Sequence, residues 1–212
     1  MTQIPDFRSD LAAAHRWVAG LMDAVEPAQW TGPTPCAEFD VRALLAHLSC
    51  HPAKIAASAD GADPRRLPAR ADIDENRPGA DYLERATAAL DRWADDTLLT
   101  STVTAPWGEA PGGLAVGAYL METVAHGWDL AVATGQNAEA HPALAAKAQA
   151  VADRALSGAF RGPGSPFGSP VEPRAQAGPT ERLAAFLGRS WPISRAESTA
   201  APAVGLGSSA PA

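Results

Sequence analysis

The stretch from Tyr119 to Gln136, YLMETVAHGWDLAVATGQ, constrains the fold more than any other part of this sequence. Its apolar residues recur on nearly every side of a helix, and a helix that is apolar all round belongs in a protein interior. Yet Glu122, His126 and Asp129 lie within it. An ionised carboxylate in an apolar interior is costly unless it is paired or binds a metal. The stretch therefore predicts a central buried helix whose polar residues are paired or bind a metal.

Apolar residues at helical spacing predict several further helices around this one. Asp40 is a suitable N-cap, Pro142 suits a first helical turn, Gly135 follows the central helix as a C′ residue, and Thr180 is the expected cap of a last short helix. The segments 59–78 and 103–113 are expected to be irregular, and no run predicts a strand. The expected helices are 7–26, 41–58, 80–97, 114–134, 142–156 and 181–187. This pattern predicts an all-α protein: a four-helix bundle with an additional packed helix and a short C-terminal helix.

The bulk composition excludes several classes of protein. A length of 212 residues predicts one domain, which we place at 1–190, followed by a tail at 191–212 that is expected to be disordered. The net charge of −7 gives no electrostatic basis for binding nucleic acid or an anionic membrane. No apolar run is long enough to span a bilayer, and the N-terminus does not resemble a signal peptide. The expected location is the cytoplasm.

Two histidines and one carboxylate are candidate metal ligands. Glu122 and His126 are four residues apart and so share one face of the central helix. His47 falls beside Leu44 and Leu48 on the helix expected at 41–58, which turns it inward. Three protein ligands with open positions are typical of a catalytic metal site. The simpler alternative is that the histidines are satisfied core residues and that Glu122 pairs with an arginine or a histidine.

Other polar residues near this set have two interpretations each. His51 is a weak catalytic candidate, as a fourth ligand, a base or a substrate contact, although a histidine on the rim of a pocket is the more ordinary interpretation. Asp129 is a candidate for orienting a ligand histidine, or equally a structural hydrogen-bond acceptor. Cys36 and Cys50 are too few for a disulfide framework. A packing role is expected for both, with a nucleophilic role as the alternative.

Three stretches carry a resemblance to a known family. They are TPCAEFDVRALLAHL at 34–48, ETVAHGWDLAVATGQ at 122–136 and ERLAAFLGR at 181–189. Together they resemble the DinB/YfiT-like superfamily and, more narrowly, its actinobacterial metal-binding branch, which is related to the N-terminal domain of mycothiol-dependent maleylpyruvate isomerase. The resemblance implies a four-helix bundle of up-down-down-up topology. It also implies a divalent metal on His47, Glu122 and His126, most often zinc, with iron or nickel as alternatives.

The same resemblance suggests a reaction. It implies mycothiol as a thiol cosubstrate, so that the metal activates the thiol for attack on an electrophilic substrate, giving an S-transferase or an isomerase. The first alternative is a metal-dependent hydrolase in which water replaces the thiol and His51 is a candidate base. The second is a non-catalytic module that binds metal or a small ligand. Relatives occur as monomers and as homodimers, and the sequence does not choose between them.

Overall fold

The computed structural model describes residues 5–156, 161 and 167–190, so the tail expected from residue 191 onward lies outside the described residues. The described chain is mostly helical, as the sequence predicts. Its helices are α1 (Arg8–Asp23), α2 (Val41–Ala59), α3 (Pro78–Asp91), α4 (Thr97–Thr100), α5 (Gly112–Ala133), α6 (Pro142–Ala155) and α7 (Pro179–Phe186). Short 3₁₀ turns lie at Pro27–Gln29 and Pro64–Arg66, and two strands at Thr102–Ala105 (β1) and Gly108–Pro111 (β2).

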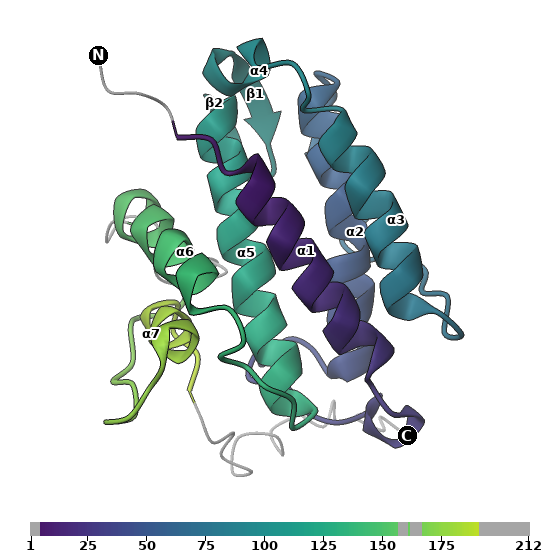
Figure 1. The fold of residues 1–212 in the computed structure, drawn as a ribbon, viewed down its shortest axis with the longest axis vertical. Helices are drawn as coiled ribbons and strands as arrows, with labels where there is room; N and C mark the ends of the chain where they lie inside the picture. Colours follow the sequence, from purple (N-terminus) through teal and green to yellow (C-terminus); the bar gives the residue numbers. More distant parts are fainter. Residues whose placement is uncertain (1–4, 157–160, 162–166, 191–212) are drawn as a thin grey trace, which may run out of the picture.

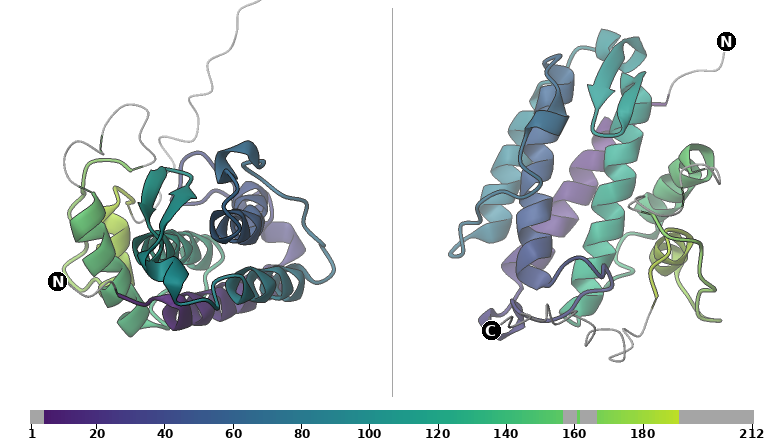
Figure 2. Two further views of the ribbon diagram at one scale, coloured as in Figure 1. Left: turned by 90° about the horizontal axis from the view of Figure 1, so that it is seen from above. Right: turned by 180° about the vertical axis from the view of Figure 1, so that it is seen from behind.

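Four long helices form the predicted bundle (Figure 1). Both α1 and α2 pack against α3 and α5, so α1 and α2 lie diagonally across the bundle. The segment after α2 runs back along that helix: Ala71 donates its backbone N–H to Ala46 at 2.9 Å, and Glu75 pairs with Arg42. This return lets α2 and α3 point the same way, which is the pair of parallel neighbours in the up-down-down-up order (Figures 1 and 2).

Helix α5 is the centre of the molecule, as its composition predicts. Most of its residues are buried, and α1, α2, α6 and α7 all pack on it. Gly127 permits the closest of these approaches, because a Cβ there would lie 2.5 Å from the Trp17 ring of α1. Within the described residues no helix is long and apolar enough to cross a membrane.

Several predicted helix ends are confirmed. The Asp40 carboxylate accepts the backbone N–H of Ala43 at 2.7 Å and so caps α2. Pro142 is the first residue of α6, and Gly135 follows α5 with a φ of +72°, in the left-handed region that favours glycine.

The predicted cap of the last helix is wrong. Gly178 is the N-cap of α7, and Thr180 lies inside the first turn. The Glu139 carboxylate, from the connection between α5 and α6, instead accepts the backbone N–H groups of Thr180 at 3.0 Å and Glu181 at 2.8 Å. A distant side chain thus satisfies the free donors that a local hydroxyl was expected to satisfy.

The expectation of no strands is also wrong. Strands β1 and β2 form an antiparallel hairpin whose register pairs Thr102 with Pro111 and Ala105 with Gly108. Val103 and Ala105 are buried and the residues between them are not, which is the period-two pattern of a half-buried strand. The sequence TVTA contains β-branched residues in this alternating pattern, but four residues are too few to predict a strand.

A buried histidine unrelated to the predicted ligands lies between α1 and α3. His15 Nδ1 lies 2.5 Å from the hydroxyl of Tyr82, and both side chains are buried. Burial lowers the pKa of His15 from 6.5 to about 3. Between these two pH values the unfolded chain binds the additional proton, so stability falls as the pH falls from 6.5 towards 3.

His15 should therefore make the protein sensitive to acid. At pH 4.5 this one group is expected to cost roughly 2–3 kcal/mol relative to neutral pH, because each pH unit below 6.5 costs about 1.4 kcal/mol. Urea unfolding of His15→Leu at pH 7 and pH 4.5 should show a correspondingly smaller loss than the parent shows. The exposed histidine variant His141→Gln is the matched control. An identical pH dependence of the parent and His15→Leu would contradict the assignment.

Candidate metal centre between α2 and α5

The interface of α2 and α5 brings four polar side chains together. His47 and His51 are one turn apart on α2, and Glu122 and His126 are one turn apart on α5. The ring centroids of His47 and His126 lie 4.9 Å apart, and the Nε2 atoms of His47 and His51 lie 3.2 Å apart. Glu122 Oε2 lies 3.9 Å from His51 Nε2. His47 therefore contacts both His51 and His126, and Glu122 approaches this cluster at His51.

Hydrogen bonds hold two of the histidines in the tautomer that a metal requires. His47 Nδ1 lies 3.2 Å from the carbonyl oxygen of Ala69, and His126 Nδ1 lies 3.0 Å from Asp129 Oδ2. Both oxygens accept, so each Nδ1 carries a proton, and in a neutral imidazole the Nε2 atom then presents a lone pair. Metal-ligating histidines almost always show this arrangement, in which the second ring nitrogen donates to a carbonyl or a carboxylate.

The charge states also suit a cation. Burial, with the nearby His126 adding to it, lowers the pKa of His47 to about 4. Burial lowers the pKa of His51 well below its ordinary value, so both imidazoles are neutral at pH 7. Glu122 is a quarter exposed, yet loss of hydration raises its pKa. Neutral imidazoles and a poorly hydrated carboxylate form a donor set that fits a divalent metal such as zinc or ferrous iron.

His51 lies deeper than its sequence position suggests. The expected place was the rim of a pocket, but the side chain is 2% exposed. Because His47 Nε2 presents a lone pair, His51 Nε2 is the donor between the two rings, and its Nδ1 has no hydrogen-bond partner among the described residues. The structure thus makes His51 an inner neighbour of both His47 and Glu122.

Asp129 joins the site to the C-terminal part of the chain. Its side chain is fully buried, and Oδ2 contacts His126 Nδ1 and, at 3.5 Å, the Nε of Arg189. Arg189 was not predicted from the sequence as part of the site, although it ends the third stretch of the family resemblance. Among the described residues, Cys36, His126 and Asp129 form the group of potential ligands whose atoms all lie within 4.8 Å of one another. This group overlaps the predicted set at His126 and is an alternative place for a cation.

Neither cysteine is placed as a ready nucleophile. The Cys50 thiol is buried and donates to the carbonyl oxygen of Ala69 at 3.2 Å. Burial raises the pKa of Cys50, and burial together with the Asp129 charge raises the pKa of Cys36. Reactive cysteines require the opposite shift, because the thiolate is the nucleophile.

Three further residues border the site and were not predicted from the sequence. The Phe39 ring stacks on His47 at 4.8 Å between centroids, and the Arg70 guanidinium lies 5.4 Å from the centre of the Phe39 ring. Lys54 lies two helical turns after His47 and raises the local positive charge felt by His47, His51 and Glu122. Its spacing of seven residues from His47 could have indicated that Lys54 lies on the same face of the helix.

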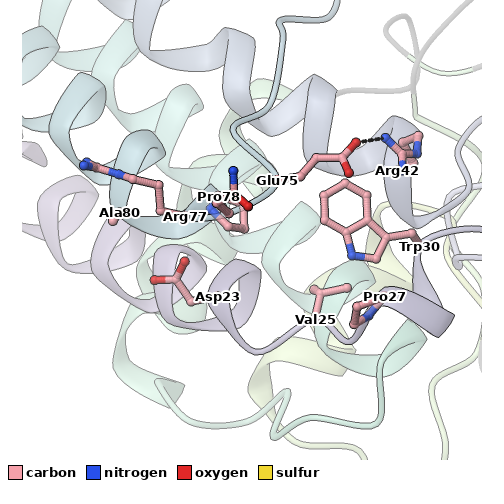
Figure 3. A pocket seen from close by; sticks show the side chains of 10 residues that line it. Asp23, Val25, Pro27, Trp30, Arg42, Glu75, Arg77, Pro78 and Ala80 are labelled. Atoms are coloured by element: carbon pink, nitrogen blue, oxygen red, sulfur yellow. Dashed lines mark hydrogen bonds and ion pairs between the residues drawn. The ribbon is translucent and has the colours of Figure 1, made fainter.

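A separate cleft of about 480 Å³ lies between the ends of α1, α2 and α3 (Figure 3). Its Trp30 ring is covered by the Arg42 guanidinium at 4.5 Å, which in turn pairs with Glu75 at 2.5 Å. None of the site histidines lines it; its lining residues are Asp23, Val25, Pro27, Trp30, Arg42, Glu75, Asn76, Arg77, Pro78 and Ala80. Trp107 packs edge-on against Tyr119 and is 44% exposed.

Comparison with known proteins gives a family and two relatives. Residues 11–131 match the family described as the mycothiol maleylpyruvate isomerase N-terminal domain. The chain is 34% identical over 174 residues to Uncharacterized protein MT0763 and to Uncharacterized protein Rv0738, both of Mycobacterium tuberculosis. Each alignment covers 81% of this chain and 91% of the relative. No solved structure is significantly similar to this chain.

The match includes α2 and most of α5, the two helices that carry the histidines and Glu122. The all-α bundle described above agrees with the fold that the sequence resemblance implied. The chain belongs to the mycothiol maleylpyruvate isomerase N-terminal domain family.

Proposed function

We propose that this protein binds a divalent metal, most often zinc, through His47, Glu122 and His126, and uses it in a mycothiol-dependent S-transfer or isomerisation. One observation carries the proposal: the Nδ1 atoms of His47 and His126 are both held by oxygen acceptors, which leaves both Nε2 atoms available to a metal that would displace the His51 contact with His47. A poorly hydrated carboxylate next to histidines whose orientation is fixed in this way is costly in a core unless it is paired or binds a cation.

The surroundings suit a reaction with an external thiol. A zinc ion held by this set would lower the pKa of a bound thiol, so that the thiolate would be present at neutral pH. The protein's own thiols are poor nucleophiles, since the pKa values of both Cys36 and Cys50 are raised. His51 is a neutral imidazole whose Nε2 proton lies beside Glu122, so it is placed to donate a proton during the reaction and to take it back. Phe39 covers His47 and limits the access of water.

S-transfer and isomerisation differ in whether the thiol is consumed. In S-transfer, a bond forms between the thiol sulfur and an electrophilic carbon of the substrate, and the thiol proton ends on the leaving group or on the adduct. In isomerisation, the same sulfur–carbon bond forms and then breaks, so the thiol is returned unchanged. The amount of free thiol after turnover therefore separates them.

The test uses tag-free, zinc-loaded full-length protein with mycothiol and a panel of electrophiles. Product masses and free thiol are measured together, with His141→Ala as the matched control for a histidine substitution outside the site. We expect turnover that requires both mycothiol and zinc, and that is lost in His47→Ala. Turnover that does not depend on thiol would replace the proposal with a hydrolase. Stable zinc binding without turnover across the panel would replace it with a non-catalytic binding module.

A further inference from the structure

The cleft between the ends of α1, α2 and α3 takes no part in the proposed reaction (Figure 3). Its volume of about 480 Å³ falls within the range of pockets that hold small molecules, roughly 300–1,000 Å³. Such pockets combine apolar walls with a few fixed polar groups. Val25, Pro27, Pro78 and Ala80 supply apolar surface to the cleft, and its remaining lining residues carry polar groups. The cleft therefore has the composition of a small-molecule site.

Trp30 brings an unused hydrogen-bond donor to this cleft. Its side chain is only 7% exposed, and the residue is held in place by Arg42: the Trp30 carbonyl oxygen accepts the Arg42 backbone N–H at 2.8 Å, and the Arg42 guanidinium covers the ring. The indole N–H has no acceptor among the described residues, yet it is not sealed inside the protein. A donor on a nearly buried side chain is costly to leave without an acceptor. Trp30 therefore offers a fixed donor to an occupant of the cleft.

The charged groups of the cleft already have partners within the protein. Arg42 pairs with Glu75 at 2.5 Å, and Arg77 pairs with a glutamate of α3. Asp23 Oδ1 accepts the backbone N–H of Gly79 at 2.7 Å, so this carboxylate stabilises the first turn of α3. With two carboxylates and two guanidinium groups in the lining, the formal charges cancel. The cleft thus gives no electrostatic preference to an anion or to a cation.

The hydrogen-bonding capacity that remains in the cleft is mixed. Asp23 and Glu75 each keep a second carboxylate oxygen without a hydrogen bond to the described residues. Asn76 is bonded there only through its backbone N–H, which leaves the carbonyl and the amide of its side chain free. A hydroxyl both donates and accepts, whereas a carboxylate only accepts and an ammonium only donates. Several hydroxyls on one apolar ring would therefore match the polar groups and the apolar walls together.

We propose that this cleft binds an uncharged, polyhydroxylated small molecule, such as a sugar ring. The indole N–H of Trp30 would donate to one hydroxyl, and Asp23 and Glu75 would each accept from another. Asn76 would do either, while the C–H face of the ring would pack on the proline and valine walls. None of the histidines of the candidate metal centre lines the cleft. The inference therefore does not depend on the proposed reaction.

NMR of the ¹⁵N-labelled full-length protein tests the site directly at the indole N–H of Trp30. Methyl glucoside is the probe. Glucosamine, glucuronate and cyclohexanol are compared with it, because they carry a positive charge, a negative charge and a single hydroxyl. Methyl glucoside should shift the Trp30 indole resonance saturably and leave that of the exposed Trp107 unchanged. Its affinity should not change with added salt, because the ligand has no charge. Cyclohexanol should bind at least about tenfold more weakly, because it loses several hydrogen bonds.

Two variants remove single hydrogen-bonding groups from the cleft. Trp30→Phe keeps an aromatic ring without the indole N–H and also identifies the Trp30 resonance, and Asn76→Ala removes an exposed amide. Each is expected to weaken methyl glucoside binding about fivefold, which corresponds to loss of one neutral hydrogen bond. The backbone amides of Arg77 and Ala80, which border the cleft, report binding in both variants. Trp107→Phe is the matched control and should bind as the parent does.

Thermal melting shows whether each variant is intact, and the exposed Asn76→Ala keeps the test decisive if Trp30→Phe does not fold. The absence of a saturable shift with methyl glucoside, or equally tight binding of cyclohexanol, would overturn the inference. Tighter binding of glucosamine or of glucuronate would also overturn it, because the cleft would then select a charge. Unchanged affinity in every folded variant of the cleft would have the same consequence. Zinc content and thiol-dependent turnover of the same samples test the proposed function separately.

Discussion

Replacement of His126 with alanine is expected to remove bound zinc from the protein. The substitution deletes one of the three proposed protein ligands and also leaves Asp129 without the imidazole that it contacts. Removing an outer-shell partner of a metal-ligating histidine costs about 10–100-fold in metal affinity, so loss of the ligand itself should cost at least about 100-fold. Elemental mass spectrometry of tag-free protein should find about one zinc per chain in the parent and almost none in the variant.

A second pair of variants decides which group of residues holds the metal. His126 belongs both to the set with His47 and Glu122 and to the compact group with Cys36 and Asp129. His47→Ala should therefore also lose zinc, while Cys36→Ser should retain it. The opposite pattern would assign the metal to the cysteine group, and zinc retained in both His126→Ala and His47→Ala would contradict the ligand set. His141→Ala is the control for an exposed histidine.

Asp129→Leu is expected to destabilise the metal-free protein by about 3–5 kcal/mol. The substitution introduces an apolar side chain of similar size and leaves the Arg189 guanidinium buried without its carboxylate. Removing one partner of a buried ion pair is strongly destabilising, because the other charge stays buried and uncompensated. At about 2–4 °C for each kcal/mol in a domain of this size, the melting temperature should fall by roughly 6–20 °C. Calorimetry in a chelator excludes any contribution from bound metal.

The double variant Asp129→Leu with Arg189→Met provides the decisive comparison. Replacing both partners of a buried pair with apolar residues is often neutral or stabilising, so most of the lost stability should return. The half-exposed pair of Lys147 with Asp10 is the control, and Lys147→Met should change stability by under about 1 kcal/mol. A double variant as unstable as the sum of its single variants would show that Asp129 and Arg189 do not act as a pair.

Local patterns in the sequence were sufficient for the main helices and for the choice of His47, Glu122 and His126 as candidate ligands. The i, i+4 spacing of Glu122 and His126 follows from helix geometry alone, and the inward face of His47 follows from Leu44 and Leu48 beside it. Asp40 was identifiable as a cap because a cap acts on its own helix within three residues. These features depend on atoms that are neighbours in sequence.

Local patterns could not predict contacts between segments that are far apart in the sequence. The cap of α7 comes from Glu139, about forty residues earlier, and so the nearby Thr180 was the wrong choice. His51 was expected on a rim, yet the packing of α2 against α5 buries it beside Glu122. Arg189 reaches Asp129 only because α7 folds back onto α5.

The sequence by itself determined that a polar set must sit inside an apolar helix, since that conclusion needs only the cost of burying charge. Tertiary structure decided what surrounds the set. The carbonyl of Ala69 and the carboxylate of Asp129 choose the tautomers of His47 and His126, and the return of the chain along α2 carries Arg70 to the same place. Orientation and electrostatic surroundings depend on groups brought together by folding, and no spacing within one helix encodes them.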